Sequence, residues 1–247
     1  MKTVASVQEL RALRLSGVGF VPTMGALHEG HLELVRIAKQ TCSSVVVSIF
    51  VNPTQFNDPQ DLQRYPRPLD KDLQLLSAEG VDAVFLPTAE EMYADGYRFS
   101  LSENQDSKVL CGPKRPGHFE GVLTVVLKLI NAVQPTHAFF GEKDFQQLKL
   151  INEMVAAFFI PTVIVPCPTV REYDGLAMSS RNLLLNQKER EIAPLFFRIL
   201  KTSSTCQEAR TDLEKSGFVV DYVEEHWGRR FAAAFLGKVR LIDNVAL

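Results

Sequence analysis

Continuous apolar runs alternate along the chain with segments in which apolar residues recur every three or four positions. Residues 18–21 and 44–51 are such runs, the second rich in valine and isoleucine, and residues 81–87 form a third. Residues 32–39 and 69–79, which lie between them, have helical periodicity. A strand that is apolar throughout is typical of a parallel sheet buried on both faces. The order therefore predicts right-handed βαβ units and an α/β fold.

The remaining segments indicate where a first domain ends. Pro166-Cys167-Pro168 marks the expected boundary between a domain of residues 1–168 and a second domain of residues 169–247. In the first domain we expect a helix capped by Ser6, a buried helix at 121–133, a strand, turn and helix at 137–148, and β-like sequence at 158–165. In the second we expect helices at 187–201, 209–217 and 232–236, and strands at 219–223 and 239–243. Residues 58–68 and 112–119 contain several Pro or Gly and are expected to be loops.

Composition excludes several classes of protein. Of 247 residues, 46% are hydrophobic and 23% charged, and the net charge is −2, which gives no electrostatic case for binding nucleic acid or an anionic membrane. No apolar run approaches the roughly twenty residues that span a bilayer, and no signal peptide is expected. The four cysteines are scattered, without a Cys-x-x-Cys pair, which argues against a zinc or redox motif and fits a cytoplasmic protein.

Two histidines stand where the first buried strand passes into a helix. His28 and His31 are three residues apart, so both imidazoles are expected on one side of the first helical turn. Gly30 between them leaves space for a ligand to approach the backbone. The N-terminus of a helix offers free N–H groups and a positive dipole, both of which favour phosphate. From the residues alone, a strand–turn–helix joint with two surface histidines remains the simpler interpretation.

Three further polar clusters are candidates for the same site. Asn52-Pro53-Thr54-Gln55 follows the second buried strand, at the sheet edge where ligands of α/β proteins gather, although an ordinary turn explains it equally well. The basic segment at 112–119, with Lys114, Arg115 and His118, fits anion binding and plain solvation equally. Ser179-Ser180-Arg181 offers hydroxyl groups and a guanidinium for phosphate oxygens, or simply a helix cap.

Taken together, four motifs in order resemble one family. The chain is similar to the pantoate–β-alanine ligases, a family of the nucleotidyltransferase superfamily with its His-x-Gly-His motif. The motifs that carry the resemblance are Pro22 to His31, Phe50 to Phe56, Gly141 to Gln147 and Met178 to Asn182, with Arg240 to Asn244 at the end. The resemblance implies a Rossmann-like parallel-sheet N-terminal domain, a small α+β C-terminal lid domain, a homodimer built on the N-terminal domains, and Mg²⁺ together with ATP.

The implied reaction has two steps. The carboxylate of pantoate attacks the α-phosphate of ATP to give pantoyl adenylate and pyrophosphate, and the amine of β-alanine then displaces AMP to give pantothenate. The resemblance assigns ATP binding to Met24, Gly25, Ala26, Leu27, His28, Glu29, Gly30, His31, Gly141, Glu142, Lys143, Asp144, Val170, Met178, Ser179, Ser180 and Arg181. It assigns pantoate binding to Gln55 and Gln147, and β-alanine binding to Gln55. It gives His31 the role of proton donor and places His28, Lys143 and Arg181 with it in catalysis. It assigns further substrate contacts to Arg115 and His118, and it places Asp72 in the region near magnesium.

The chemistry of these residues fits the reaction. A carboxylate is already ionised at neutral pH, so the first step needs no base. Its difficulty is the charge that gathers on the α-phosphate and the leaving pyrophosphate, which calls for preorganised cations and hydrogen-bond donors. Glutamine side chains can hold the hydroxyl and carboxylate groups of pantoate without neutralising the nucleophile.

One departure from the family is expected near the C-terminus. Residues 226–230 lead almost directly to the predicted helix at 232–236, where the family continues through a further strand. We therefore expect a shortened lid that covers the adenylate incompletely. Two alternatives to an active ligase remain: a cytidylyltransferase with the same histidine turn, and a nucleotide-binding protein that has lost catalysis. The glutamines argue against the first, and retention of Lys143, Ser179 and Arg181 argues against the second.

Overall fold

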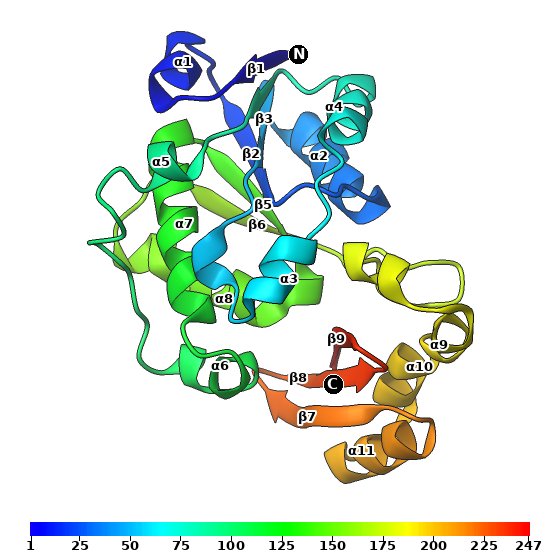
Figure 1. The fold of residues 1–247 in the computed structure, drawn as a ribbon. Coiled ribbons are helices and arrows are strands. Elements are labelled where there is room, and N and C mark those ends of the chain that lie inside the picture. Colours follow the sequence, from blue (N-terminus) through cyan, green and yellow to red (C-terminus); the bar gives the residue numbers. More distant parts are fainter.

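The N-terminal part of the molecule is a parallel sheet of six strands in the order β1-β4-β3-β2-β5-β6 (Figure 1). The computed structural model describes residues 1–247. The strands are β1 (Lys2–Val4), β2 (Val18–Thr23), β3 (Ser44–Ile49), β4 (Ala83–Phe85), β5 (His137–Gly141) and β6 (Val163–Cys167). All neighbouring strands run parallel, as the continuous apolar runs predict. The predicted α/β fold with a Rossmann-like sheet is confirmed.

Successive residues of each strand enter cores on opposite faces of this sheet. Phe20 packs into one core and Val21 into the other, and Ala138 and Phe139 divide in the same way. One face is covered by α1 (Val7–Ala12), α5 (Ala89–Met92), α7 (His118–Val133) and α8 (Phe145–Ala157). The other is covered by α2 (Glu29–Thr41) and α4 (Leu69–Ala78). Burial on both faces is the reason why these strands are apolar throughout.

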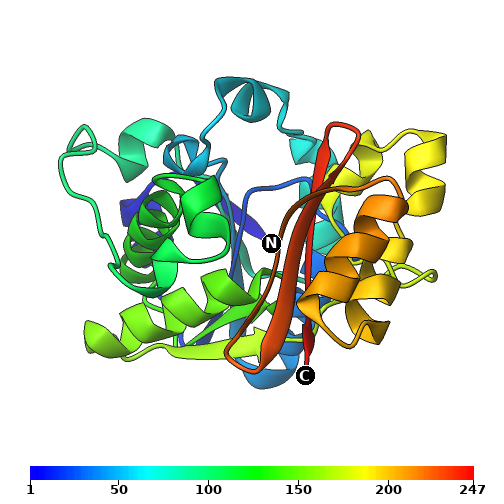
Figure 2. The ribbon, with the colours of Figure 1, turned by 90° about the horizontal axis from the view of Figure 1, so that it is seen from below.

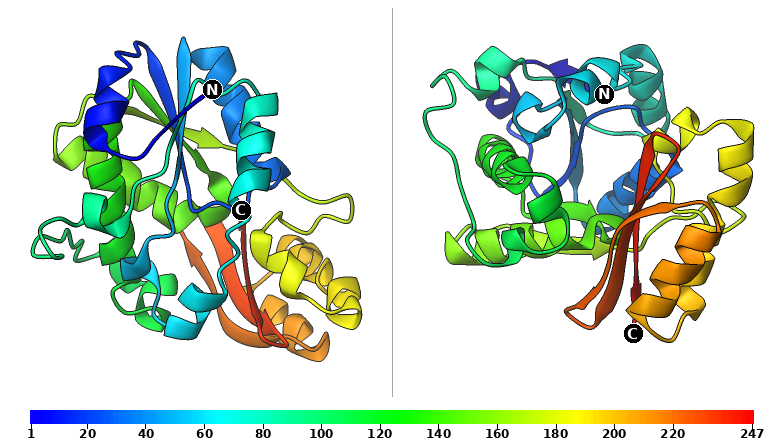
Figure 3. Two further views of the ribbon diagram at one scale, coloured as in Figure 1. Left: turned by 45° about the horizontal axis from the view of Figure 1, so that its top comes forward. Right: turned by 60° about the horizontal axis from the view of Figure 1, so that its bottom comes forward.

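The C-terminal part is a three-stranded antiparallel sheet with helices on one side. It contains β7 (Val219–His226), β8 (Arg229–Leu236) and β9 (Val239–Ala246), preceded by α9 (Gln187–Ile192), α10 (Leu195–Thr202) and α11 (Cys206–Lys215). α10 and α11 cover the face turned away from the parallel sheet (Figures 2 and 3). The opposite face sends Tyr222, Phe231 and Ala233 into the core beneath α7 and α8. The two sheets are therefore packed together rather than joined only by a linker.

The helix expected at residues 232–236 is wrong, because this segment is the middle of β8. Ala232 and Ala234 enter the core under α10 and α11, and Ala233 enters the core of the N-terminal part. Alanine favours helix by less than 1 kcal/mol per residue, which burial on two faces readily outweighs. Trp227 and Gly228, both with positive φ, form the two-residue turn between β7 and β8. The strand that the sequence analysis did not find is therefore present.

Two expected loops contain helix. Residues 59–64 form α3 (Pro59–Arg64), in which Asp58 Oδ1 accepts the Gln60 N–H at 2.8 Å and Pro59 occupies the first turn. Both residues are favourable at a helix start, so the proline marks a beginning rather than a break. Residues 111–114 form α6 (Cys111–Lys114), and α7 begins at His118 rather than at Gly121.

The other differences concern where elements begin and end. The helix expected at 187–201 is divided between α9 and α10 around Pro194, which cannot donate a backbone hydrogen bond. Residues 158–162 precede β6 instead of belonging to it. The capping of α1 by Ser6 is confirmed, since its hydroxyl accepts the Glu9 N–H at 3.1 Å.

Candidate active site

A cleft of about 360 Å³ lies at the carboxyl ends of the parallel strands, against the C-terminal sheet. It is bounded by the β2–α2 turn, by η1 (Pro53–Gln55) after β3, by η3 (Glu142–Asp144) after β5, by η4 (Ser180–Leu184) and by β9. The carboxyl edge of an open α/β sheet is where ligands of such folds bind. Of the residues assigned from sequence, those lining it are Met24, His28, Gly30, His31, Gln55, Arg115, His118, Gly141, Lys143, Asp144, Gln147, Val170, Met178, Ser179, Ser180 and Arg181.

The two histidines stack at the start of α2, with ring centroids 4.1 Å apart. His28 is the N-cap of the helix, and its Nδ1 accepts the Gly30 N–H at 3.2 Å. Nδ1 of His31 accepts the His28 N–H at a longer 3.4 Å. Because a backbone N–H can only donate, Nδ1 of each ring is unprotonated and the neutral ring carries its proton on Nε2. Each histidine can therefore donate a hydrogen bond from Nε2.

Burial keeps both imidazoles neutral at physiological pH. Burial, together with the smaller effect of the positive charge of Lys143, lowers the pKa of His28 to about 4. It lowers the pKa of His31 to about 3, with smaller contributions from His28 and Lys143. The turn therefore offers neutral hydrogen-bond donors to an anionic ligand, and the cationic charge of the site comes from lysine and arginine.

Asp72, which the resemblance placed in the region near magnesium, supports the backbone of the histidine turn. Its side chain on α4 is 1% exposed and does not line the cleft. Its two oxygens accept the backbone N–H groups of Ala26 and Leu27, each at 2.8 Å. Gly25 and Ala26 both have positive φ, a conformation that these hydrogen bonds stabilise. A carboxylate engaged in this way supports the turn, and its assignment to the region near magnesium stays a prediction.

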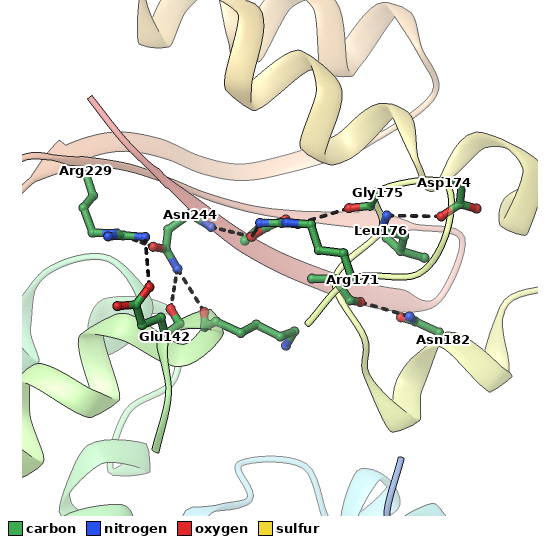
Figure 4. A network of polar contacts seen from close by, with 11 residues as sticks. Glu142, Arg171, Asp174, Gly175, Leu176, Asn182, Arg229 and Asn244 are labelled. Carbon is green, nitrogen blue, oxygen red and sulfur yellow. Dashed lines mark hydrogen bonds and ion pairs between the residues drawn. The ribbon is translucent and has the colours of Figure 1, made fainter. Parts of the chain in front are cut away.

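Five other residues expected to bind ATP lie outside the cleft wall. Gly25, Ala26 and Leu27 form the buried part of the turn above Asp72. Glu29 faces away and pairs with Arg36. The side chain of Glu142 points toward Arg229, at 3.9 Å (Figure 4). In this structure they shape the turns whose neighbours reach the cleft.

Gln55 is oriented by a buried asparagine that sequence analysis left unassigned. Asn52, 1% exposed, donates from Nδ2 to Gln55 Oε1 at 3.1 Å and to the Gly121 carbonyl at 3.2 Å. Its Oδ1 accepts the Tyr93 hydroxyl at 2.7 Å. This orients the Gln55 amide so that its NH₂ group points away from Asn52 and donates to Met24 Sδ at 3.1 Å. The polar cluster after β3 was the signal that could have identified Asn52.

The two adjacent glutamines at the start of α8 have different surroundings. Gln147 lines the cleft. Gln146 is buried and turned away, where it accepts the Cys111 N–H at 3.1 Å and donates to the carbonyls of Asp106 and Val109 at 2.9 and 2.8 Å. Gln146 therefore fixes the segment before α6, and only Gln147 is placed to contact a ligand.

The cationic wall of the cleft comes from η3 and η4. Ser179 caps η4, since its Oγ accepts the Arg181 N–H at 3.3 Å, so the predicted capping role and exposure to the cleft occur together. Arg181 Nη2 lies 3.1 Å from Asp61 Oδ2 of α3, and Lys143 Nζ lies 4.0 Å from Asp144 Oδ2. A side-chain atom added at Gly141 would meet nothing within 4 Å, which leaves open space beside the backbone there.

A polar network fastens β9 to this cationic wall (Figure 4). Asn244 Nδ2 donates to the carbonyls of Glu142 and Lys143 at 2.9 and 3.1 Å. Arg171 forms two hydrogen bonds with Asp243, at 2.6 and 3.0 Å, and one with the Gly175 carbonyl at 3.1 Å. Through Asn244, the closing Arg240-to-Asn244 motif of the C-terminal sheet holds the backbone of η3 in place.

Sequence analysis gave no role to Arg240, which also lines the cleft. Its guanidinium donates to Asp221 Oδ2 of β7 at 2.8 and 3.1 Å and lies 3.7 Å from Cys111 Sγ of α6. Asp61, Tyr65 and Thr169 line the cleft as well. The only sequence signal for Arg240 was its place in the closing motif.

No group of three or more His, Cys, Asp or Glu side chains is arranged to hold a metal ion. Mg²⁺ bound with ATP needs only one or two protein carboxylates, so the magnesium implied by the resemblance stays a prediction. None of the helices is both long and apolar enough to cross a membrane.

Comparison with known proteins gives a consistent result. A family model described as pantoate-beta-alanine ligase matches residues 1–246. A pantothenate synthetase of Bdellovibrio bacteriovorus is 55% identical over 247 residues, which cover 100% of this chain and 98% of that relative. One of Legionella pneumophila is 50% identical over 230 residues, 93% of this chain and 91% of that relative.

Solved structures are similar in fold over the whole chain. The pantoate-beta-alanine ligase of Francisella tularensis, complexed with beta-gamma ATP and beta-alanine, has a TM-score of 0.94 at 42% identity, covering 100% of this chain and 97% of that one. The pantothenate synthetase of Thermus thermophilus has a TM-score of 0.93 at 42% identity and is covered to 99%. The chain covers nearly the whole of these two proteins. The strand that the sequence analysis expected to be missing from the C-terminal domain is β8, so the expected shortening is wrong.

Proposed function

The chain belongs to the pantoate-beta-alanine ligase family, and from this membership we propose how its cleft carries out the reaction. It is an enzyme that condenses pantoate with β-alanine in an ATP-dependent reaction. The observation that carries the proposed mechanism is the meeting, in one cleft, of neutral histidine donors, a cationic wall and two glutamines. Family membership decides against the cytidylyltransferase alternative, and the complete set of these residues argues against a protein that has lost catalysis.

In the first step, we propose that Gln55 and Gln147 hold pantoate beside the α-phosphate of ATP. A carboxylate oxygen of pantoate bonds to the α-phosphorus, and the bond from that phosphorus to the bridging oxygen of pyrophosphate breaks. The Nε2–H groups of His28 and His31 donate hydrogen bonds to the phosphate as charge develops. His31 takes the proton-donor role of the family in this form, as a hydrogen-bond donor, because its pKa of about 3 leaves little imidazolium at neutral pH.

The leaving pyrophosphate is the more charged product, and we assign it to the cationic wall. Lys143 and Arg181 supply positive charge, and the hydroxyls of Ser179 and Ser180 supply further donors. Gly30, Gly141, Asp144, Val170, Met24 and Met178 form the surface against which the nucleotide packs. We expect Mg²⁺ to enter with the triphosphate, because phosphate oxygens are ligands that it prefers.

In the second step, the amine of β-alanine attacks the acyl carbon of the adenylate. A C–N bond forms, the bond from the acyl carbon to the AMP oxygen breaks, and AMP leaves. The amine must first lose a proton, because its pKa of about 10 makes it an ammonium ion at neutral pH. The packing of the C-terminal sheet against the cleft supports a covering role for residues 169–247, which we keep as the second domain.

Pantoate-dependent exchange between ATP and pyrophosphate tests this order of events. We expect exchange in the absence of β-alanine, and none when pantoate is omitted or when CTP replaces ATP. Purified protein that forms pantothenate without showing such exchange would contradict the adenylate intermediate. With the strand β8 in place, we expect little AMP release from pantoate and ATP alone, contrary to the incomplete cover anticipated from the sequence.

We also propose a homodimer formed through the N-terminal domain and a cytoplasmic location. The dimer is supported by apolar side chains beside the edge strand β6: Phe159 is 93% exposed, and Phe158 and Val163 are also exposed. Four free cysteines fit a reducing compartment. Sedimentation of the wild type and of a Phe159→Glu variant tests the dimer, and an unchanged sedimentation coefficient would contradict this interface.

A further inference from the structure

Arg229 stands at the first position of β8 and reaches from the C-terminal sheet to η3, the turn that carries Lys143 (Figure 4). Its Nε donates to Asn244 Oδ1 at 2.5 Å, and its Nη2 lies 3.9 Å from Glu142 Oε2. Its guanidinium carbon lies 4.6 Å from the centre of the Phe145 ring. Arg229 belongs to none of the motifs recognised in the sequence and does not line the cleft. Any part that it takes in the reaction must therefore act through a neighbour.

The amide of Asn244 has only one orientation that satisfies its surroundings. The residue is 3% exposed, and a guanidinium N–H can only donate, so the atom that faces Arg229 is Oδ1. Nδ2 then faces the carbonyls of Glu142 and Lys143, to which it donates at 2.9 and 3.1 Å. The reversed amide would set N–H groups against Arg229 and an oxygen against two carbonyls. Arg229 therefore decides which end of this amide meets η3.

The backbone of Asn244 is held by a separate set of contacts. Its N–H donates to Asp243 Oδ1 at 2.8 Å, and Asp243 is paired with Arg171. Asn244 also lies opposite Phe231 in the β8–β9 ladder. Loss of the Arg229 side chain would therefore leave β9 in place and release only the amide of Asn244.

The placement of Lys143 depends on the two hydrogen bonds from that amide. η3 is three residues long, and no side chain caps its start. The ammonium of Lys143 makes no hydrogen bond, and the only carboxylate within 4.0 Å of it is that of Asp144, on the same turn. The direction in which Lys143 reaches into the cleft is therefore set by its own backbone, whose carbonyl is held by Asn244.

We propose that Arg229 is a positioning residue of the first half-reaction, because it orients the Asn244 amide and so fixes the backbone from which Lys143 reaches the phosphates. The inference rests on the proposed function, which assigns the leaving pyrophosphate to Lys143. A displacement of about 1 Å at a group that stabilises the transition state can cost about 100-fold in rate. Pantoate is affected less, since Gln55 lies on η1 and the start of α8 is anchored separately by Gln146.

Two substitutions at Arg229 separate its hydrogen bond from its charge. Arg229→Met removes the donor and keeps an unbranched chain beside the Phe145 ring. We expect its kcat for pantoate-dependent ATP–pyrophosphate exchange to fall about 10- to 100-fold, with the KM for pantoate within about twofold of wild type. In Arg229→Gln the amide nitrogen is as many bonds from the backbone as Nε and can donate to the same oxygen, so exchange should return to within about fivefold of wild type. A role through the carboxylate of Glu142 or the Phe145 ring needs the charge and would not be rescued.

A double-mutant cycle with Asn244→Ala tests the route of the effect. Because Arg229 is proposed to act through that amide, adding Arg229→Met to Asn244→Ala should change exchange by less than about twofold. Arg230→Gln is the matched control on the same strand. Arg230 pairs with Glu225 at 2.8 Å and donates to the Ser204 carbonyl at 3.1 Å, away from η3. Its substitution should lower the melting temperature and leave exchange within about twofold of wild type.

Asn244→Asp provides a second test should Arg229→Met fail to fold. Its carboxylate can pair with Arg229 but cannot donate to the two carbonyls of η3, so exchange should fall as far as expected for Arg229→Met.

The inference is overturned by unchanged exchange in Arg229→Met or Asn244→Asp, by equal losses in Arg229→Met and Arg229→Gln, or by additive losses in the cycle. A KM for pantoate that rises in step with the loss of turnover also overturns it, because it indicates a distorted cleft. Each of these results leaves the proposed function standing as long as the wild type shows exchange. Absence of exchange in the wild type would contradict the proposed function, and the inference with it.

Discussion

At the scale of single residues, the histidine turn combines two tasks in each side chain. Nδ1 of each ring accepts a backbone N–H and fixes the first turn of α2, and Nε2 is left to donate into the cleft. An alanine substitution would remove both functions together. Substitutions that keep a capping acceptor but lack the imidazole Nε2 separate them, because asparagine is among the best residues at an N-cap.

We predict that His28→Asn and His31→Gln each lower kcat about 100-fold, the scale for losing a preorganised donor to developing charge. Stability should change little in His28→Asn, because the cap is kept. The measurement is turnover at saturating ATP, with thermal unfolding in parallel. His137→Ala, at the opposite end of β5, is the control. Turnover near that of wild type in both variants would remove the turn from the chemistry.

The neighbouring glutamines allow a second comparison at this scale. Gln147→Ala should raise the KM for pantoate about tenfold or more with little loss of stability, since its amide faces the cleft. Gln146→Ala should lower the free energy of unfolding by about 1–3 kcal/mol, because three buried or partly buried backbone groups lose their partner. Steady-state kinetics and urea unfolding of both variants check this. The reverse pattern would show that the two side chains have been assigned the wrong way round.

At the scale of elements, the loops that form the cleft are held from outside it. α4 supports the β2–α2 turn through Asp72, α7 supports η1 through the Gly121 carbonyl, and β9 supports η3 through Asn244. Each contact joins segments far apart in the sequence. The precision of the site therefore depends on residues that never meet a substrate.

Asp72→Asn tests this support. The amide presents a donor to one of two backbone N–H groups, so we expect the free energy of unfolding to fall by about 2 kcal/mol and the KM for ATP to rise. The concentration of free Mg²⁺ that gives half-maximal activity should not change. Asp70→Asn, on the exposed side of the same helix, is the control. A large change in the Mg²⁺ concentration that gives half-maximal activity would support the assignment of Asp72 to the region near magnesium.

At the scale of the whole molecule, three neutral histidines couple stability to pH. The folded-state pKa values of His28, His31 and His118 are about 4, 3 and 3, below the usual 6.5 of an unfolded chain. Between pH 6.5 and 4 the unfolded state therefore binds more protons than the native state. Their contribution to stability is complete above pH 6.5 and is lost as the pH falls.

We predict that His118→Gln has a shallower dependence of unfolding free energy on pH, by about 1.4 kcal/mol per pH unit between roughly pH 6 and 4. Denaturant unfolding at several pH values measures this slope. Aspartates and glutamates titrate in both proteins, so the difference between the two slopes isolates the histidine. Equal slopes would show that His118 is protonated in the native state.

Local signals in the sequence were enough for the parallel sheet and for the motifs around the cleft. A strand buried on both faces is apolar throughout, and a helix start favours a capping side chain, so both features can be recognised from neighbouring residues in the sequence. The histidine turn, the polar cluster at Gln55 and the segment Ser179 to Arg181 became candidates in this way, with ordinary turns and caps still open as alternatives. The reaction itself was inferred from the resemblance to the ligase family, because no single motif identifies it.

Tertiary structure alone decided which way particular side chains point and what they meet. Ala232 to Leu236 has helical composition but lies in a strand between two cores, since burial outweighs a weak local preference. Gln146 and Gln147 are adjacent and identical in type, yet only the structure shows that Gln146 binds backbone groups of a distant segment while Gln147 lines the cleft. Arg229 is one cation among several until the structure shows that it meets Asn244 of the neighbouring strand. Partners contributed by remote parts of the chain leave no local pattern, and they fix the charge and orientation of the site.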